Sequence, residues 1–561
     1  MAFHESIRMV ESMLLDPAEA KLRTHWMLWV LAVPTIGGLV SGALLQYVVP
    51  EARGSGIPQV KVAYAQDSGK LPFHVSIGKF FIGVIQIGTG SSLGREGPTV
   101  QICAGIASLF GGAAALSRQG LRRMLPVGAA AGIAAAFNAP IAAVTFAIEE
   151  IIGDLDQAVL SGVIVAAALA AVIERSILGQ NPVLHVGRQY SLQHPTSLIL
   201  YALLGVVAAF VSMLFTDSLL ILRDRFKRLN AIPGWMHPAI GGLTTGALAV
   251  VALRWLNVDG VTGGGYRTLS TALSGNLAVK ALLLLCIMKL VATVVSYSSG
   301  GAGGIFAPAL FIGGMLGGAV GYLDHLLLAS SSEQVGAFAL VGMGAVFAGI
   351  VRAPITSVLI IFEMTNSYGL ILPLMIANMS AYALARRYRP TPIYEALIQQ
   401  DGIQLPHRRS RINPLDRLPV AAVMTTKAVT ILPGSTVDQA LEKVATSEYN
   451  IYPVVSADGG FAGFIQASRL RLERANGNGG EAVSSFAWAG EAVNPDVPTT
   501  RAAVKLNQSG IHLLAVVAPD EKRTFLGLLT SSDIVRAHAD AAPDRTEDQA
   551  KREGSRERIP R

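Results

Sequence analysis

Long runs of apolar residues fill the chain from residue 26 to residue 401 and become scarce beyond it. Leu198–Thr216, for example, contains no charged residue, and a run of that length can cross the hydrocarbon core of a bilayer as a helix. Beyond residue 401, short β-branched segments alternate with polar helical ones, as they do in soluble proteins. The pattern predicts an all-α polytopic membrane domain followed by a soluble α/β domain.

The apolar region contains an internal repeat. Pro34–Leu44 and Pro238–Leu248 agree at eight of eleven positions, and Val127–Glu150 matches Val341–Met364 at nine of twenty-four. Between these anchors, the segment GREGP stands opposite GIFAP. The offset grows from 204 to 210 to 214 residues, as small loop insertions would produce. Three pairs in the same order indicate two halves with a common plan.

The two halves are predicted to cross the membrane in opposite directions. The segment after GREGP carries Arg118, Arg122 and Arg123, whereas its counterpart, Asp324–Glu333, has no Lys or Arg. Because basic loops stay on the cytoplasmic side, these two segments are expected on opposite sides. An inverted internal repeat interrupted by Gly and Pro is typical of transporters, whose ion site lies near the midplane between the repeats.

The repeat also sets the predicted domain boundaries. The second half has an apolar segment at Leu198–Leu222, for which the first half offers only the short, polar Met1–Leu15; this indicates a truncated or mis-assigned start. The expected parts are a first-helix remnant (1–25), membrane repeat 1 (26–190), membrane repeat 2 (191–401), a linker (402–416), two similar soluble modules (417–475 and 485–541) and a disordered tail (542–561). The modules are expected to contain strands at Ile451–Val455, Phe461–Ile465, Leu513–Val517 and Phe525–Leu529.

The formal net charge of +7 does not indicate a nucleic-acid partner. The basic residues cluster in short segments beside apolar ones, which is the pattern of loops retained in the cytoplasm. These clusters are Arg118, Arg122 and Arg123; Arg223, Arg225, Lys227 and Arg228; Arg386, Arg387 and Arg389; and Arg408, Arg409 and Arg411. The two cysteines, Cys103 and Cys286, lie in apolar stretches. We therefore expect no disulfide, no metal site, no catalytic cofactor and no enzyme activity.

Three segments broken by glycine and proline interrupt the membrane domain. Glycine before a proline-started helix leaves the first-turn N–H groups free and lets a ligand approach the backbone closely. These N–H groups and the positive end of the helix dipole favour an anion, so three such helix starts can solvate a halide. The segments are Gly54, Ser55, Gly56, Ile57 and Pro58; Gly94, Arg95, Glu96, Gly97 and Pro98; and Gly303, Gly304, Ile305, Phe306, Ala307 and Pro308. For any one segment alone, glycine that packs helices together is the simpler interpretation.

Together with Tyr394 in PIYEAL, these segments resemble the four filter segments of the CLC family of chloride channels and chloride–proton antiporters. The similarity follows the family's order along the whole membrane domain. The resemblance implies an α-helical homodimer with an anion pathway in each subunit. It also implies that the Ser55 and Tyr394 hydroxyls and the backbone N–H groups of Ile305 and Phe306 bind the central anion. Serine at position 55 resembles chloride-selecting members more than nitrate-selecting ones.

Two glutamates bear on the mechanism. An ionised Glu96 can occupy the anion site, and a protonated Glu96 can leave it. Glu96 is therefore predicted to gate the pathway and to carry protons. The alternative is that its carboxylate only caps its own helix. Glu150 aligns with Met364 and so breaks the repeat, and it resembles the internal proton-transfer site of the family's exchangers. Glu149 aligns with Glu363, which favours a structural role.

The two soluble modules resemble a tandem pair of CBS modules. Thr530–Asp533 directly follows a predicted strand and resembles the Ser/Thr-x-x-Asp that binds the ribose of adenine nucleotides, since an Asp can accept from both ribose hydroxyls. The equivalent segment of the first module, Gln466–Arg469, lacks the acid. A regulatory adenine nucleotide at Thr530 and Asp533 and a purely structural module pair are both open.

The preferred interpretation is a proton-coupled chloride antiporter. We expect a homodimer in the plasma (inner) membrane, with chloride and protons as its ions and the CBS pair in the cytoplasm. A passive chloride channel explains everything except Glu150, and an exchanger of another small anion, such as nitrate or fluoride, is a further alternative. A cation transporter is disfavoured because the broken segments present positive helix ends to the pathway.

Overall fold

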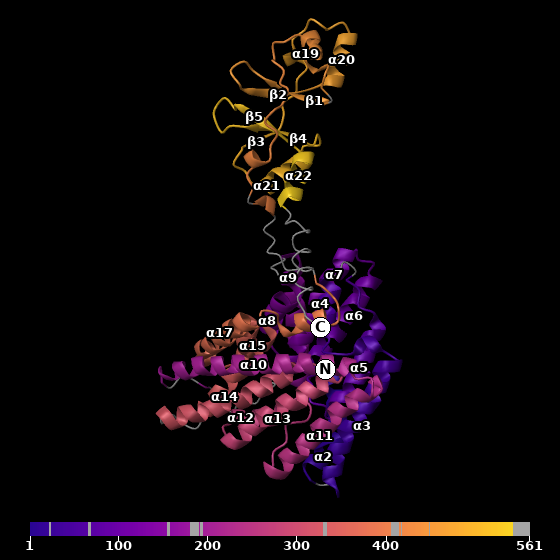
Figure 1. The fold of residues 1–561 in the computed structure, drawn as a ribbon, viewed down its shortest axis with the longest axis vertical. Coiled ribbons are helices and arrows are strands. Elements are labelled where there is room, and N and C mark those ends of the chain that lie inside the picture. The colour runs from indigo at the N-terminus through magenta and orange to yellow at the C-terminus, as the bar shows by residue number, and fades with distance from the viewer. Residues whose placement is uncertain are drawn as a thin grey trace, which may run out of the picture. The chain divides into compact units, whose positions relative to one another are not determined.

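The structure is a computed structural model in which the chain forms two compact units, Met1–His407 and Arg408–Arg561 (Figure 1). It describes residues 1–21, 24–65, 69–153, 157–179, 190, 194–328, 334–405, 414–416, 418–447 and 449–541. The basic cluster at Arg408, Arg409 and Arg411, most of the expected linker and the expected tail lie outside the described residues. Each unit is considered by itself.

The first unit is helical throughout its described part. The helices of its first half are α1 (Ala2–Leu14), α2 (Asp16–Glu19), α3 (Trp26–Tyr47), α4 (Ile57–Ala65), α5 (Phe73–Gly88), α6 (Glu96–Ala113), α7 (Arg118–Phe137), α8 (Pro140–Phe146) and α9 (Gln157–Leu178). The α8 helix continues directly into a π-helical turn, Ala147–Ile152, which contains Glu149 and Glu150. Single π-helical turns of this kind are frequent at functional sites.

The second half repeats this plan. Its helices are α10 (Ser197–Arg228), α11 (His237–Trp255), α12 (Tyr266–Leu273), α13 (Val279–Ser298), α14 (Phe306–Leu328), α15 (Gln334–Val351), α16 (Pro354–Thr365), α17 (Ile371–Tyr388) and α18 (Ile393–Gln400). Figure 1 shows α11, α13 and α14 lying side by side. Among the described residues, eight helices are long and apolar enough to cross a membrane.

The two halves pack against each other through Pro34–Leu44 and Pro238–Leu248, the segments in which the repeat is most evident. Helices α3 and α11 cross so closely that a methyl group on Gly38 would overlap the carbonyl oxygen of Pro238. The reciprocal contact is equally tight, because a methyl group on Gly242 would overlap the carbonyl oxygen of Pro34. Gly242 is the repeat counterpart of Gly38, and Pro34 is the counterpart of Pro238. The two contacts are therefore related by a pseudo-twofold axis between α3 and α11. The internal repeat predicted from the sequence is therefore present in the fold.

The expectation that the basic clusters lie in short loops was wrong, because residues 223–228 end α10 and Arg386 and Arg387 end α17. Arg118, Arg122 and Arg123 do not lie in a loop, because α7 begins at Arg118. The Ser117 side chain accepts a hydrogen bond from the Gly120 N–H at 3.2 Å and so caps the helix just before these arginines. In the counterpart segment, α14 extends to Leu328, and residues 329–333 lie outside the described part.

The second unit contains two small α/β modules. The first has α19 (Val437–Val444), the antiparallel strands β1 (Ile451–Val455) and β2 (Phe461–Gln466), and α20 (Ala467–Ala475). The second has β3 (Ala492–Val493), α21 (Thr499–Gln508), β4 (Leu513–Val517), β5 (Phe525–Thr530) and α22 (Ser531–Ala541). Its sheet has the order β3-β4-β5. The four predicted strands are confirmed, whereas the two-residue strand β3 was not foreseen.

Candidate functional site

The two halves are joined at the second and third broken segments, GREGP and GIFAP. The Gly94 N–H donates to the Gly304 carbonyl, and the Gly304 N–H donates back to the Gly94 carbonyl, both at 2.7 Å. A methyl group on Gly94 would overlap the Glu96 carboxylate, and one on Gly304 would lie a tight 3.2 Å from the Gly94 carbonyl oxygen and the Gly97 nitrogen. The glycines therefore allow two backbones to pair directly at the interface between the halves.

The segment GSGIP meets GREGP at the same place. A methyl group on Gly97 would lie 2.5 Å from Ser55 Oγ, and one on Gly56 would lie 2.6 Å from the Gly97 carbonyl oxygen. Gly54 and Gly56 also adopt the left-handed conformation, with φ of 81° and 100°, which other residues rarely reach. All three predicted segments thus converge, although they are far apart in the sequence.

Three helices begin inside these segments: α4 at Ile57, α6 at Glu96 and α14 at Phe306. The first-turn N–H groups of a helix have no partner within that helix. The positive ends of the three helix dipoles and these N–H groups together make the meeting point attractive to an anion. Ile305 and Phe306 are completely buried there, and the Phe306 ring packs against Phe137 and Phe347 at centroid distances of 4.9 and 4.2 Å.

The hydroxyls predicted to face the central anion belong to Ser55 and Tyr394, which are both completely buried. Within the described part of the chain, neither hydroxyl has a partner at hydrogen-bond distance, although the two hydroxyls lie near enough to act on each other. A buried polar group without a partner costs about 1–3 kcal/mol, so such groups call for an explanation such as an unseen ligand. Two unpartnered donors beside three helix starts are what an anion site requires.

The Glu96 carboxylate does not cap its own helix. Its Oε1 accepts a hydrogen bond from the Tyr266 hydroxyl at 2.6 Å, and its Oε2 accepts from the Ala307 N–H at 3.3 Å. Ala307 lies in the first turn of α14, and Glu96 is completely buried. The carboxyl group therefore lies at a helix start of the other half, which is a position suited to an anion.

Glu150 is also buried, and it forms an ion pair with Lys61. Lys61 Nζ lies 2.5 Å from Glu150 Oε1 and 3.9 Å from Glu395 Oε1. Lys61 and Glu150 are 5% and 4% exposed, so this pair is almost fully removed from solvent. Glu395 directly follows Tyr394, which places a chain of charged groups between the π-helical turn and the start of α18.

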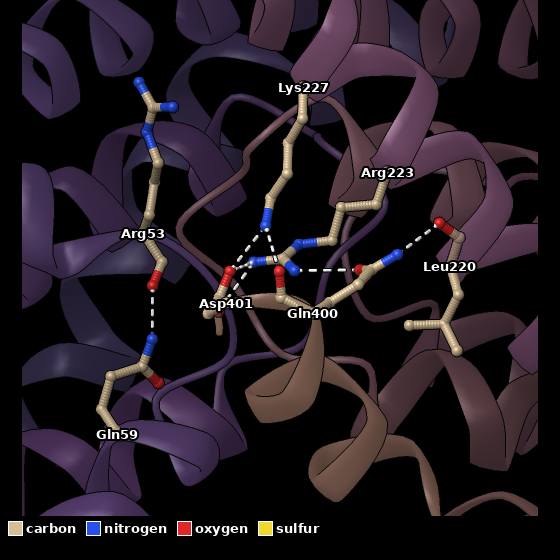
Figure 2. Close-up of polar contacts among 7 residues, drawn as sticks. All are labelled: Arg53, Gln59, Leu220, Arg223, Lys227, Gln400 and Asp401. Carbon is tan, nitrogen blue, oxygen red and sulfur yellow. Dashed lines mark hydrogen bonds and ion pairs between the residues drawn. The ribbon is translucent and has the colours of Figure 1, made fainter. Parts of the chain in front are cut away.

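A cavity of about 390 Å³ borders Gly54 and Tyr297 and is lined by five charged side chains, three of them basic. Figure 2 shows Arg223 and Lys227 converging on Asp401, with Arg53 on the other side. Arg223 Nη2 lies 2.8 Å and Lys227 Nζ 2.7 Å from Asp401 Oδ1. The fifth charged residue is Glu51, so the lining retains an excess of one positive charge. This charge favours anions at the mouth of the cavity.

Comparison with known proteins agrees with this arrangement. Residues 37–386 match the family described as Voltage gated chloride channel, which is more than half of the chain. The chain belongs to the voltage gated chloride channel (CLC) family. Residues 420–474 and 491–540 each match the CBS domain. The chain is thus a multi-pass membrane protein of the CLC family with two CBS modules.

Two curated relatives and three solved structures illustrate the similarity of this CLC chain to known proteins. The H(+)/Cl(-) exchange transporter ClcA of Vibrio campbellii is 35% identical over 395 residues, which cover 68% of this chain and 84% of the relative. ClcA of Salmonella paratyphi A is 34% identical over 411 residues, covering 71% and 84%.

A slow cyanobacterial Cl-/H+ antiporter shares 28% identity at a TM-score of 0.65, over 71% of this chain and 93% of that one. A CLC-type fluoride/proton antiporter shares 25% identity at a TM-score of 0.57, over 70% and 94%. A eukaryotic CLC transporter covers 95% of this chain and 94% of its own at 20% identity and a TM-score of 0.59, which shows a common fold.

The CBS pair of this CLC chain places Thr530 and Asp533 at the start of α22. Asp533 Oδ2 accepts from the Thr530 N–H at 2.9 Å and from its hydroxyl at 2.7 Å. Its Oδ1 accepts from the Thr425 hydroxyl at 3.0 Å and from Arg536 at 2.5 Å. In this arrangement the carboxylate joins β5 to α22 and is 4% exposed. The predicted nucleotide site stays a prediction.

Three residues of the site region were missed by the sequence analysis: Tyr266, Lys61 and Asp401. A signal for Tyr266 existed, because GGGY at Gly263–Tyr266 follows GSGI at Gly54–Ile57 by 209 residues, within the offsets of the repeat. Lys61 and Asp401 had no such signal. Among the residues that the structure describes, no group of His, Cys, Asp or Glu side chains could hold a metal ion, and Cys103 and Cys286 are both free.

Proposed function

We propose that the chain exchanges chloride for protons across the membrane, with Glu96 as the mobile gate. The observation that carries this proposal is the Glu96 carboxylate, which accepts a hydrogen bond from the first turn of α14. A carboxylate at that helix start occupies a place that also suits a halide. When Glu96 takes up a proton it loses its charge and its attraction to the helix start, so an anion can replace it.

The central anion is proposed to lie between the Ser55 and Tyr394 hydroxyls and the N–H groups of Ile305 and Phe306. The two unpartnered hydroxyls support this assignment. Neutral donors suit transport, because binding has to be strong enough for the ion to enter and weak enough for it to leave. Glu96 then competes with the anion for neighbouring helix ends, and this competition links anion movement to proton uptake.

Chloride and protons are proposed as the ions because relatives named H(+)/Cl(-) exchange transporters reach 35% identity. Serine at position 55 also resembles the chloride-selecting members of the family. The similarity to a structure titled as a fluoride/proton antiporter keeps fluoride as an alternative, and nitrate remains a second one. The unpartnered hydroxyl of Ser55 is compatible with each of these small anions.

Glu150 is proposed to supply protons from the cytoplasm to Glu96. Its burial beside Lys61 and Glu395 supports a charged relay that bulk water does not reach freely. The same ion pair is the observation that favours the second candidate, a passive chloride channel. If Lys61 alone explains why an acid is present at position 150, no proton transfer through Glu150 is needed.

Reconstituted liposomes distinguish the two candidates. With a chloride gradient as the only driving force, wild-type protein is expected to move protons uphill, recorded as a change of external pH. Glu96→Gln should abolish proton movement while chloride flux continues, and Glu150→Gln should do the same. Glu149→Gln serves as the control, since it removes the same charge one residue away. Proton movement that persists in Glu96→Gln would overturn the assignment, and chloride flux without proton movement in wild-type protein would make the chain a channel.

We further propose a homodimer in the plasma (inner) membrane, with the CBS pair in the cytoplasm and an adenine nucleotide as a possible ligand of Thr530 and Asp533. Cross-linking in liposomes tests the dimer. Titration with ATP, with Asp533→Asn as the comparison, tests the nucleotide. Because the Asp533 carboxylate already has four partners, a nucleotide would have to displace some of them. Equal ATP binding by wild type and Asp533→Asn would exclude this site.

A further inference from the structure

The hydroxyl of Tyr266 is a second donor to the gating carboxylate. Each Glu96 oxygen accepts one hydrogen bond, Oε1 from Tyr266 at 2.6 Å and Oε2 from the Ala307 N–H at 3.3 Å, and Arg95 Nε lies 3.9 Å from Oε1. The tyrosine contact is the shortest of the three. Hydrogen bonds that involve an ionised group are about twice as strong as those between neutral groups. The Tyr266 hydroxyl therefore contributes a large part of what keeps an ionised Glu96 in this position.

The backbone that leads into Tyr266 is held in place by several contacts. Tyr266 is the first residue of α12, and the preceding Gly265 has a φ of 76°; a methyl group there would lie 2.6 Å from the Phe311 ring. The completely buried Lys289 Nζ lies 2.6–3.2 Å from the carbonyl oxygens of four successive loop residues, Gly260 to Gly263, which share its three N–H groups. The loop is thereby anchored, so the hydroxyl is aimed at Glu96 rather than free to turn away.

A buried lysine also anchors a glycine-rich loop in the first half. Lys79, which precedes Lys289 by 210 residues, donates hydrogen bonds to the carbonyls of Ala52 and Gly54 in the loop that carries Ser55. Each half thus has a buried lysine that anchors a glycine-rich loop, and each loop brings one hydroxyl to the pathway. The first loop presents Ser55 beside Gly97, and the second presents Tyr266 to Glu96.

We propose that Tyr266 is a positioning residue for the gate: its hydroxyl holds the ionised Glu96 in the pathway and thereby limits how often the gate opens. The proposal rests on the proposed function, in which Glu96 has to leave this position in every cycle. Tyr266 stays protonated throughout and only donates; no covalent bond changes. Removing the hydroxyl leaves the carboxylate with two longer contacts, to the Ala307 N–H at 3.3 Å and to Arg95 Nε at 3.9 Å, so Glu96 should be released more readily.

The test compares wild type, Tyr266→Phe, Glu96→Gln and the double variant in liposomes, with chloride release and proton uptake recorded together. Tyr266→Phe is expected to raise the coupled turnover roughly tenfold, as the loss of one hydrogen bond to a charged group implies. The ratio of chloride to protons should stay the same, and the half-saturating chloride concentration should fall, because a weakly held Glu96 competes less with the anion. In the Glu96→Gln background, the same change should have little effect on chloride flux, because no charged carboxylate is left to hold.

Tyr322→Phe is the matched control. The Tyr322 hydroxyl donates to the Leu277 carbonyl at 2.9 Å, so this change also removes one tyrosine hydrogen bond but leaves Glu96 untouched. If Tyr266→Phe does not fold, Tyr266→Leu removes the same hydroxyl and should raise turnover in the same direction.

An unchanged turnover in Tyr266→Phe would overturn the proposal. An equal effect with and without Glu96 would also overturn it, because Tyr266 would then act on the anion or on the shape of the pathway. Failure of the proposed function gives a different result, namely proton movement that persists in Glu96→Gln whatever residue stands at position 266.

Discussion

Glu149 and Glu363 each cap the helix that belongs to the other half. Glu149 accepts from the Thr356 N–H at 2.8 Å in the first turn of α16, and Glu363 accepts from the Ala142 N–H at 2.7 Å in the first turn of α8. The two residues are related by the repeat, so the contacts are reciprocal. This exchange supports the structural role that the alignment favoured for Glu149.

Replacing either cap should destabilise the protein without changing its ion coupling. Glu149→Gln and Glu363→Gln are each expected to cost about 1–2 kcal/mol, because the helix start loses a charged acceptor. Thermal unfolding in detergent measures the cost, and transport by the folded fraction should keep its ratio of chloride to protons. A changed ratio in Glu149→Gln would mean that this residue also takes part in proton transfer.

Gly97→Ala should block transport, whereas Gly112→Ala should not. Both glycines lie on α6, but a methyl group on Gly97 would lie 2.5 Å from Ser55 Oγ, and one on Gly112 would meet nothing within 4 Å. The first change pushes two of the converging segments apart. The second replaces glycine within a helix and should stabilise it by up to about 1 kcal/mol. Chloride flux and unfolding temperature separate the two outcomes, and normal flux in Gly97→Ala would contradict the described contact.

Ser55→Ala and Tyr394→Phe should each weaken chloride binding about tenfold, because each removes one donor to a charged ligand. Calorimetric titration with chloride measures the change. Tyr201→Phe is a matched control, since Tyr201 is also completely buried and its hydroxyl also has no partner in the described part of the chain. It packs on Phe338 at a centroid distance of 4.0 Å, away from the three broken segments. Equal losses in the control and in Tyr394→Phe would remove the case for the central site.

Lys61→Met should leave Glu150 as an uncompensated buried charge. Loss of one partner from a buried ion pair costs about 3–5 kcal/mol, whereas loss of both is far better tolerated. We therefore expect a large drop in unfolding temperature for Lys61→Met and a partial recovery in Lys61→Met/Glu150→Gln. If the single variant were as stable as wild type, the short contact between these side chains would contribute little to the fold.

Asp401→Asn should favour anion access at the cavity beside Gly54. The change frees Arg223 and Lys227 from their shared carboxylate, so transport at low chloride on that side should rise roughly twofold to threefold. The effect should fade in about 1 M salt, where charges are screened within about 3 Å. Asp224→Asn is the control, because Asp224 pairs with the exposed Arg228 at 2.8 Å and does not line the cavity.

A loosened α18 helix is the competing explanation for faster transport in Asp401→Asn. The double variant Asp401→Asn/Arg223→Gln restores the original net charge and should therefore return the rate to the wild-type value. A rate that stays high in the double variant would favour the loosened helix.

The sequence analysis predicted those parts of the site that depend on the internal repeat and on the glycine motifs. The convergence of GSGIP, GREGP and GIFAP, the burial of Ser55 and Tyr394, and four strands of the CBS pair all follow from local patterns. The Lys61–Glu150 ion pair joins residues 89 positions apart, and no motif in either segment indicates that these two side chains would meet. Tyr266 was missed because its loop kept the glycines of the repeat but lost the proline that marked the other segments.

The paired backbones of Gly94 and Gly304 restrict how the halves can move. Many transporters with inverted repeats alternate access by rocking one half against the other. Here such rocking would break both hydrogen bonds of that bridge and would separate α3 from α11, whose backbones touch at Gly38 and Gly242. The scaffold is therefore suited to stay still during the cycle. In the proposed exchange cycle, alternating access would therefore depend on single side chains, Glu96 above all, and the pathway would open and close by a rotamer change rather than by domain motion.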